Sequence, residues 1–77
     1  MVRKHSVTIS GHRTSFSVED AFFDGLRRTA ERRGLSLAAL IAVIDEAKPA
    51  DSNLSSALRI FVLEEALAGR LTGHLRE

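Results

Sequence analysis

The sequence predicts a mainly α-helical domain that begins with a short β ribbon, and three observations support this. Between residues 13 and 18, polar and apolar side chains alternate, which is the period of a strand. From residue 18 onward, apolar residues recur every three or four positions, which is the period of a helix. Gly34 and the single proline, Pro49, then divide the remaining chain into three helices. We therefore expect a single domain over residues 1–77.

The predicted strand over residues 13–18 needs a partner, because a lone strand leaves its N–H and C=O groups unpaired. A second alternating run covers residues 5–9, and the residues that follow it, which include Gly11, are typical of a turn. A hairpin over residues 5–17 is one arrangement. The alternative is a continuous extended arm.

Polar residues mark the start of each predicted helix. Ser17 and Asp20 match a capping box, so the first helix should begin near residue 18 and end before Gly34. Ser36 is the expected N-cap of a second helix that ends by residue 48, so that residues 18–48 form a helix-turn-helix pair. The N-cap of the third helix is expected at Ser52 or Asn53.

The second and third helices are apolar on nearly all sides, and a helix of this kind must be covered on several sides. The third helix is expected over residues 53–69, followed by a frayed segment over residues 70–77. A chain of 77 residues with no Cys has neither a large core nor disulfides, so we expect a homodimer with two-fold symmetry. Its core and interface are expected to include Phe16, Val18, Phe22, Leu26, Leu40, Ile41, Ile44, Leu58 and Phe61.

Composition excludes several classes of protein. No stretch reaches the roughly 18 apolar residues that a membrane span requires, and no apolar signal segment follows the N-terminus, so a cytoplasmic location is expected. Cys is absent and the three His are scattered, so no metal site is expected. There is no nucleophile–base arrangement and no glycine-rich phosphate loop. We therefore expect neither an enzyme nor a cofactor.

Positive charge gathers at the N-terminus of a nearly neutral chain. Residues 1–18 hold Arg3, Lys4 and Arg13 and no acidic residue, whereas residues 19–77 sum to −2. A dimer doubles this patch, which favours a phosphate-bearing partner. A charged terminus that keeps the protein soluble explains the same pattern.

The second helix is poorly suited to reading DNA, because it is apolar up to Ile44 and its Asp45 and Glu46 repel phosphate. A strand ribbon suits the chain better, since the major groove also admits a two-stranded antiparallel ribbon. With Phe16 turned toward the helices, the outward side chains are polar. These expected base-reading residues are Arg13, Ser15 and Ser17.

Phosphate contacts are expected from backbone and side chains. The free N–H groups at the start of the second helix, around Ser36 and Leu37, suit an anion. The expected side-chain contacts are Arg3, Lys4 and His12. His5 and His12 are also explained as exposed turn residues. Four arginines of the first helix, Arg27, Arg28, Arg32 and Arg33, have Asp24 and Glu31 nearby, so we interpret them as a solvated face with ion pairs.

The order of strand, capped helix, glycine-containing turn and second helix over about residues 12–48 resembles the ribbon-helix-helix repressors of the Arc/MetJ group. The segments Ser6–Phe22, Arg33–Leu37 and Asn53–Arg59 resemble a short bacterial ribbon-helix-helix subfamily assigned to DNA binding. The resemblance implies an intertwined homodimer with antiparallel strands paired between subunits. It places Arg13, Ser15 and Ser17 at base-reading positions, and Ser36 and Leu37 at a phosphate. The extra N-terminal strand and third helix, and the short Ser side chains, depart from the minimal pattern.

Two functional hypotheses follow. The first is a homodimeric transcriptional regulator that inserts a two-stranded β ribbon into the major groove of double-stranded DNA. The second is a dimeric, antitoxin-like interaction module on the same fold. In that module the C-terminal helix or the N-terminal strand binds a protein partner, and sequence-specific DNA binding is weak or lost.

Overall fold

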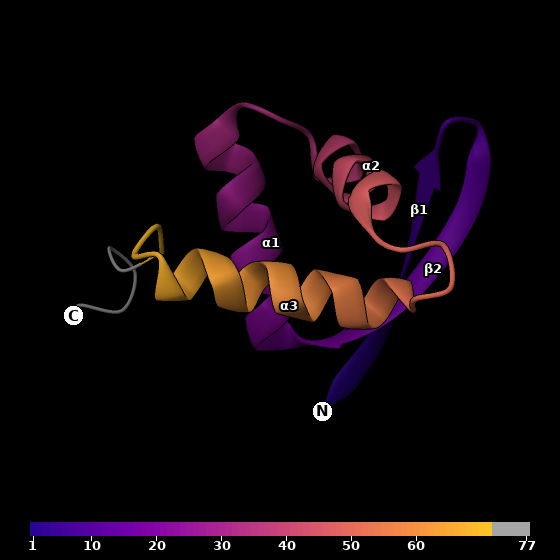
Figure 1. Ribbon diagram of the computed structural model, residues 1–77. Coiled ribbons are helices and arrows are strands. Elements are labelled where there is room, and N and C mark those ends of the chain that lie inside the picture. The colour runs from indigo at the N-terminus through magenta and orange to yellow at the C-terminus, as the bar shows by residue number, and fades with distance from the viewer. Residues whose placement is uncertain (72–77) are drawn as a thin grey trace.

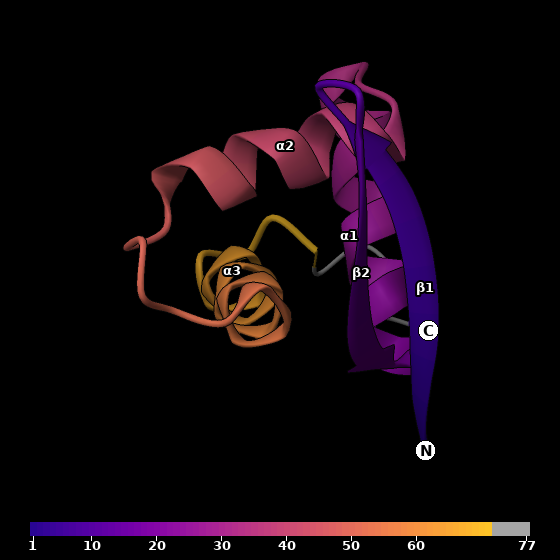
Figure 2. The ribbon, with the colours of Figure 1, turned by 90° about the vertical axis from the view of Figure 1, so that its right-hand side faces the viewer.

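The computed structural model describes residues 1–71. Its elements are β1 (Val2–Ile9), β2 (His12–Glu19), α1 (Asp20–Arg33), α2 (Leu37–Ala47) and α3 (Leu54–Leu67). The hairpin lies along one side of the helices, and α3 crosses in front of α1 (Figures 1 and 2). A two-stranded antiparallel ribbon followed by three helices confirms the predicted fold class.

β1 and β2 pair along their whole length, and Ile9 lies opposite His12 at the closed end. The turn consists of Ser10 and Gly11, whose φ angles of 50° and 81° are the left-handed values that a tight two-residue hairpin requires. Of the two arrangements open for the N-terminal segment, the hairpin is therefore the correct one. Pairing between the strands of two subunits stays a prediction.

α1 begins later than the sequence indicated. Ser17 lies within β2, opposite Lys4, and the N-cap of α1 is Glu19, which makes no side-chain cap hydrogen bond. The N–H of Ser17 donates to Oγ of Ser55 at 2.9 Å. The predicted capping box is therefore wrong, because the ladder with β1 and the contact with α3 hold Ser17 in an extended conformation.

The other helix ends follow the predicted local signals. Gly34 ends α1 with φ 71°. Oγ of Ser36 accepts a hydrogen bond from the N–H of Ala39 at 3.1 Å, and Oδ1 of Asn53 accepts one from Ser56 at 3.1 Å. Of the two candidate caps of α3, Asn53 is the one observed.

The core lies between the inner face of the hairpin and the three helices. The expected core residues that are buried are Phe16, Val18, Leu26, Leu40, Ile41, Ile44 and Leu58. Phe22 and Phe61 are partly buried and pack against this cluster. Full burial of one such side chain stabilises the fold by about 1.5–3 kcal/mol.

The buried carboxylate of Glu65 joins the C-terminal end of α1 to the C-terminal part of α3. Oε1 of Glu65 accepts from Arg32 at 3.0 Å, and Oε2 accepts from Arg33 at 3.4 Å and from Arg70 at 3.0 Å. The Glu65 side chain is 4% exposed, whereas the three arginine side chains are 40–47% exposed. Leu71 is also buried. The expectation of fraying is therefore wrong for residues 70–71, and the rest of that segment lies outside the described residues.

The four arginines of α1 divide into two pairs. Arg27 and Arg28 both form ion pairs with Asp24, as the spacing on the helix predicted. Arg32 and Arg33 bind Glu65 of α3 instead, so this pair makes a tertiary contact rather than a solvated face.

α1 and α3 approach closely at Gly25, which is buried in α1. A Cβ atom at this position would lie 2.7 Å from Cγ1 of Val62 on α3. Glycine is therefore required here for close packing, a requirement that the periodicity of the sequence does not reveal.

Gly25→Ala should lower the free energy of unfolding by about 1–2 kcal/mol, because overpacking against Val62 outweighs the gain in helix propensity. Val62→Ala removes the clashing methyl groups. Urea denaturation of both single variants and the double variant should then give a coupling energy of about 1 kcal/mol in favour of the double variant. Additive effects would contradict a tight contact.

Glu65→Gln should lower the free energy of unfolding by about 1–3 kcal/mol, because it weakens three charge-assisted hydrogen bonds at a buried group. Glu64→Gln is the matched control, because Glu64 is the adjacent glutamate and its side chain is exposed. Thermal denaturation should show a clear decrease for the first variant and a change within about 0.5 kcal/mol for the second. Equal effects would show that the cluster contributes nothing.

Candidate nucleic-acid interface

The outer face of the hairpin is a polar, two-stranded surface. Side chains alternate along each strand, and directly opposed residues share a face. The pairs on the outer face are Lys4–Ser17, Ser6–Ser15 and Thr8–Arg13. All six residues except Ser17 are exposed. We call these six residues the ribbon face.

The structure separates the three N-terminal basic residues that the sequence grouped together. Lys4 and Arg13 belong to the ribbon face and form no ion pair within residues 1–71. Arg3 lies opposite buried Val18, on the other face of the hairpin. Its Nε atom is 3.0 Å from Oδ1 of Asp20, and both side chains are more than 60% exposed. The positive charge of the ribbon face therefore comes from two residues per chain.

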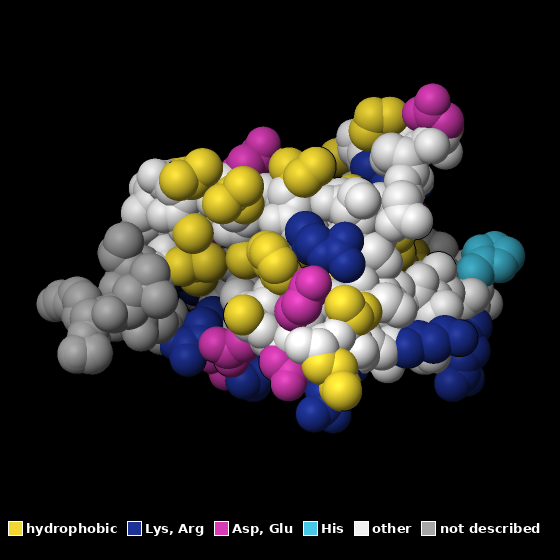
Figure 3. Space-filling view, turned by 90° about the horizontal axis from the view of Figure 1, so that it is seen from below, with side chains coloured by type: hydrophobic (Ala, Val, Ile, Leu, Met, Phe, Trp, Pro, Cys, Tyr) yellow, Lys and Arg dark blue, Asp and Glu magenta, His cyan; other side chains and the backbone are white. Residues whose placement is uncertain are grey.

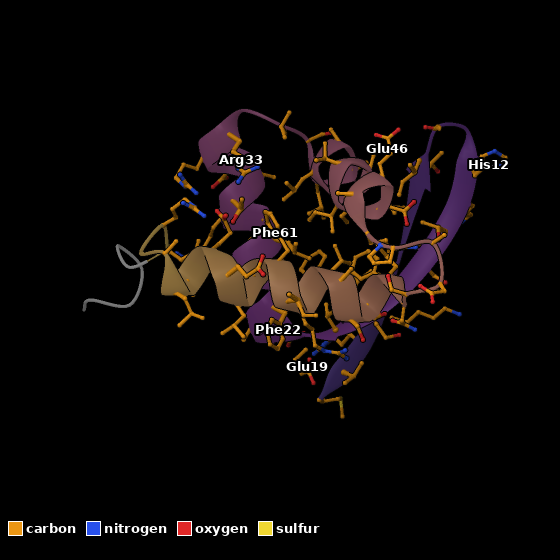
Figure 4. The ribbon with its side chains drawn as sticks, viewed as in Figure 1. His12, Glu19, Phe22, Arg33, Glu46 and Phe61 are labelled. Carbon is orange, nitrogen blue, oxygen red and sulfur yellow. The ribbon has the colours of Figure 1, made fainter. Side chains whose placement is uncertain are left out.

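His12 is exposed at the closed end of the hairpin and points away from the helices (Figure 4). Figure 3 shows the same end of the molecule, where Lys or Arg side chains lie near a His side chain, while hydrophobic side chains gather over α3.

His5 is neither exposed nor part of a turn, so that interpretation is wrong. Its ring is nearly parallel to that of Phe23, with centroids 4.0 Å apart and an interplanar angle of 4°. The Phe16 ring also stacks with the His5 ring, and their centroids are 5.3 Å apart. His5 is on the inner face of β1 and packs against α1, and its Nε2 atom is buried without a partner. It therefore contributes to packing rather than to the ribbon face.

The start of α2 keeps the backbone groups that an anion needs. Ser36 is exposed, and its hydroxyl already accepts the N–H of Ala39. The first-turn N–H groups of Leu37 and Ala38 have no intrahelical acceptor, as at any helix start. These amides and the positive end of the helix dipole suit a phosphate oxygen.

The N-terminal half of α3 binds the free edge of β2, a contact that the sequence analysis missed. Besides the Ser55 contact, the C=O of Ser17 accepts a hydrogen bond from Nη2 of Arg59 at 3.3 Å. Nε of Arg59 also donates to Oε1 of Glu19 at 3.1 Å. The only sequence signal is that Ser55 and Arg59 are four residues apart and share a helix face. Nothing local shows which strand that face meets.

The electrostatics near Glu19 follow from these contacts. A hydrogen bond from its own backbone N–H lowers the pKa of the Glu19 carboxyl, and the hydrogen bond from Arg59 lowers that pKa further. The Arg28 guanidinium likewise lowers the pKa of Asp24. Asp45 and Glu46 lie beside the ribbon, where they line with Arg13 a hollow of about 390 Å³. These two acids oppose phosphate binding near one end of the ribbon face.

A second surface is apolar and lies between α2 and α3. It is a groove of about 530 Å³, lined mainly by apolar residues that include Val43, Ile44 and Phe61. Val43 and Ile60 are 52% and 55% exposed. Farther along α3, Leu63 and Leu67 are 52% and 78% exposed. The helices that the sequence marked as excessively apolar thus leave apolar surface uncovered in one chain.

The ribbon-helix-helix domain family matches residues 2–66 of this chain. The chain belongs to the ribbon-helix-helix family. The match includes β1 and nearly all of α3, so both additions to the minimal pattern lie within the family domain. No curated protein and no solved structure matches the chain. Ribbon-helix-helix proteins are generally homodimers that bind DNA and regulate transcription. Among the described residues, no helix is long and apolar enough to cross a membrane.

Glu19→Gln should destabilise the protein at neutral pH and lose that effect in acid. The lowered pKa means that folding favours the ionised carboxyl, so its contribution is present above its ordinary pKa of 4.5 and is lost as pH falls below that value. Urea denaturation at several pH values should show the gap to wild type closing in acid. Glu46→Gln controls for loss of an exposed acidic charge, and a pH-independent gap for Glu19→Gln would contradict the assignment.

Proposed function

We propose that this protein is a homodimeric transcriptional regulator that places its ribbon face in the major groove of double-stranded DNA. The observation that carries the proposal is the exposed ribbon face, which combines Arg13 with hydroxyl groups and contains no acidic residue. The major groove is wide enough for such a ribbon. In this arrangement Arg13 donates to O6 and N7 of guanine, and Ser15 and Ser17 bond to neighbouring base edges.

The flanking groups supply affinity without sequence information. His12 at the closed end of the hairpin, and the amides at Ser36 and Leu37, contact phosphates in this proposal. Arg3 is able to exchange Asp20 for a phosphate, because an ion pair between two exposed side chains contributes little stability. Binding should therefore weaken steeply as salt is added.

The apolar groove between α2 and α3 supports the homodimer. Val43 and Ile60 are each more than half exposed there. A second copy that presents the same groove across a two-fold axis would cover both sets of side chains at once. This association also supplies apolar burial that a chain of 77 residues lacks by itself.

A second candidate function is a protein-interaction module on the same fold. The observation that favours it is the exposure of Leu63 and Leu67, which lie on α3 outside the groove. A second copy that covers the groove therefore does not account for these two side chains. In this role α3 binds a protein partner, as in an antitoxin. A folded protein that binds no DNA at low salt would favour this candidate over the first.

Arg13→Ala should lower affinity for a preferred duplex, which can be selected with the wild-type protein from a randomised pool. The expected loss is about 10-fold to 100-fold, because a bidentate contact to guanine is removed. Arg27→Ala is the matched control, since it removes the same charge from an exposed site that pairs with Asp24. Fluorescence anisotropy at two salt concentrations measures both variants, and the absence of wild-type binding at low salt would overturn the proposal.

Ile60→Glu should disrupt the homodimer by placing a charge in the apolar groove, and the affinity of association should fall by about 100-fold or more. Leu35→Glu is the control, because Leu35 is 38% exposed and does not line the groove. Sedimentation equilibrium reports the association, and circular dichroism checks that both variants keep their helices. Equal association of the two variants would exclude the groove as the interface.

A further inference from the structure

We infer that α3 packs in parallel against α3 of a second copy, along the two-fold axis of the homodimer, so that both hairpins lie at the same end of the dimer. The inference rests on the proposed function, because it names the helix and the orientation through which the proposed homodimer forms. It concerns the exposed side of α3, opposite the side that packs into the core. Four observations carry it.

The first observation is the composition of the exposed side of α3. The exposed residues of this helix are Ser56, Ile60, Leu63, Glu64 and Leu67. Three of these five are large and apolar, with exposed fractions of 55%, 52% and 78%. The outer side of a solvated helix normally carries polar side chains instead. We call Ile60, Leu63 and Leu67 the α3 stripe, and its composition is that of a contact surface.

The second observation is the spacing of the α3 stripe. Its members are three and four residues apart, which is the spacing of heptad positions a, d and a. This spacing places all three side chains along one seam that a second helix can cover. Ile60 at position a with Leu63 at position d is the combination that favours two strands in parallel coiled coils. A second copy of α3 supplies a helix with the matching pattern.

The third observation is the charge beside the α3 stripe. Glu64 at position e is exposed and forms no ion pair within residues 1–71. Arg59 at position g binds Ser17 and Glu19 through Nη2 and Nε, which leaves Nη1 to donate. In a parallel pair, position g of one helix meets position e of the other, so Arg59 approaches Glu64 of the second copy. Such an exposed ion pair contributes little energy, but it favours the parallel orientation.

The fourth observation is the position of the hairpin relative to α3. Ser55 and Arg59 hold the first turns of α3 next to β2, and the helix then runs away from the hairpin (Figure 1). Figure 2 looks from the hairpin side and shows α3 end-on. A parallel pair therefore places both hairpins at one end of the dimer, where a single duplex can meet both ribbon faces. An antiparallel pair would place them at opposite ends of a helix about 20 Å long.

The α3 stripe is continuous with the groove that the proposed function assigns to the homodimer. Ile60 belongs to both surfaces, and Glu64 also lines the groove. A second copy that lies along α3 therefore covers this side of the groove and the stripe together. Leu63 and Leu67, which the groove alone leaves in water, are then buried by the same partner.

Leu67→Glu separates this interface from one that is confined to the groove. Leu67 does not line the groove, so a homodimer that used only the groove would tolerate the substitution. We expect the affinity of association to fall by about 10-fold or more, because a charge enters the seam. Sedimentation equilibrium measures the association, with Leu35→Glu as the control. Equal association of the two variants would overturn the inference.

A disulfide tests the orientation of the two helices. The chain contains no Cys, so Leu67→Cys introduces a single thiol near the C-terminal end of α3. In a parallel pair the two residues at this position face each other, and we expect mild oxidation to link two chains on a non-reducing gel. An antiparallel pair would hold the two thiols apart. Arg27→Cys is the control, because this residue of α1 is 56% exposed and lies outside the stripe. No linkage of Leu67→Cys, or equal linkage of both variants, would overturn the inference.

The linked dimer connects this interface to DNA binding. The oxidised Leu67→Cys protein should bind the selected duplex at least as tightly as the reduced protein, because both hairpins already lie at the same end. A loss of binding of about 10-fold or more on oxidation would overturn the inference. Absence of duplex binding by the wild-type protein would overturn the proposed function instead, while sedimentation and the disulfide still decide whether α3 pairs with its copy.

Discussion

The backbone hydrogen bonds of β2 are the constraint on which the rest of the structure depends. A strand has two edges, and its buried N–H and C=O groups need partners on both. β1 pairs with one edge over the whole strand, and Ser55 and Arg59 of α3 bind the other edge at Ser17. Because α1 follows β2 without a loop, this pairing also fixes where α1 begins. The hairpin, the first helix and the third helix are therefore positioned by one strand.

Polar contacts at the two ends of α3 decide which of its apolar sides remains outside. Ser55 and Arg59 attach one end to β2, and Glu65 attaches the other end to Arg32 and Arg33 of α1. Between these points the helix directs Leu58 and Val62 into the core. Three other apolar residues of α3, Ile60, Leu63 and Leu67, are left at the surface. A helix that is apolar all round thus gains a definite inner side from its charged and hydroxyl groups.

Sequence reasoning succeeded where a feature depends on neighbouring residues and failed where it depends on distant ones. The turn at Gly11 and the caps at Ser36 and Asn53 are set within four residues of chain, and they were predicted. Ser17 suits both a helix cap and a strand, and only its contact with α3 decides between them. Two partners of Glu65, Arg32 and Arg33, lie more than thirty residues away on α1, so no local pattern could identify them. For the candidate site, alternation placed Arg13 and Ser15 correctly on one face, but only the register of β1 separates Arg3 from Lys4.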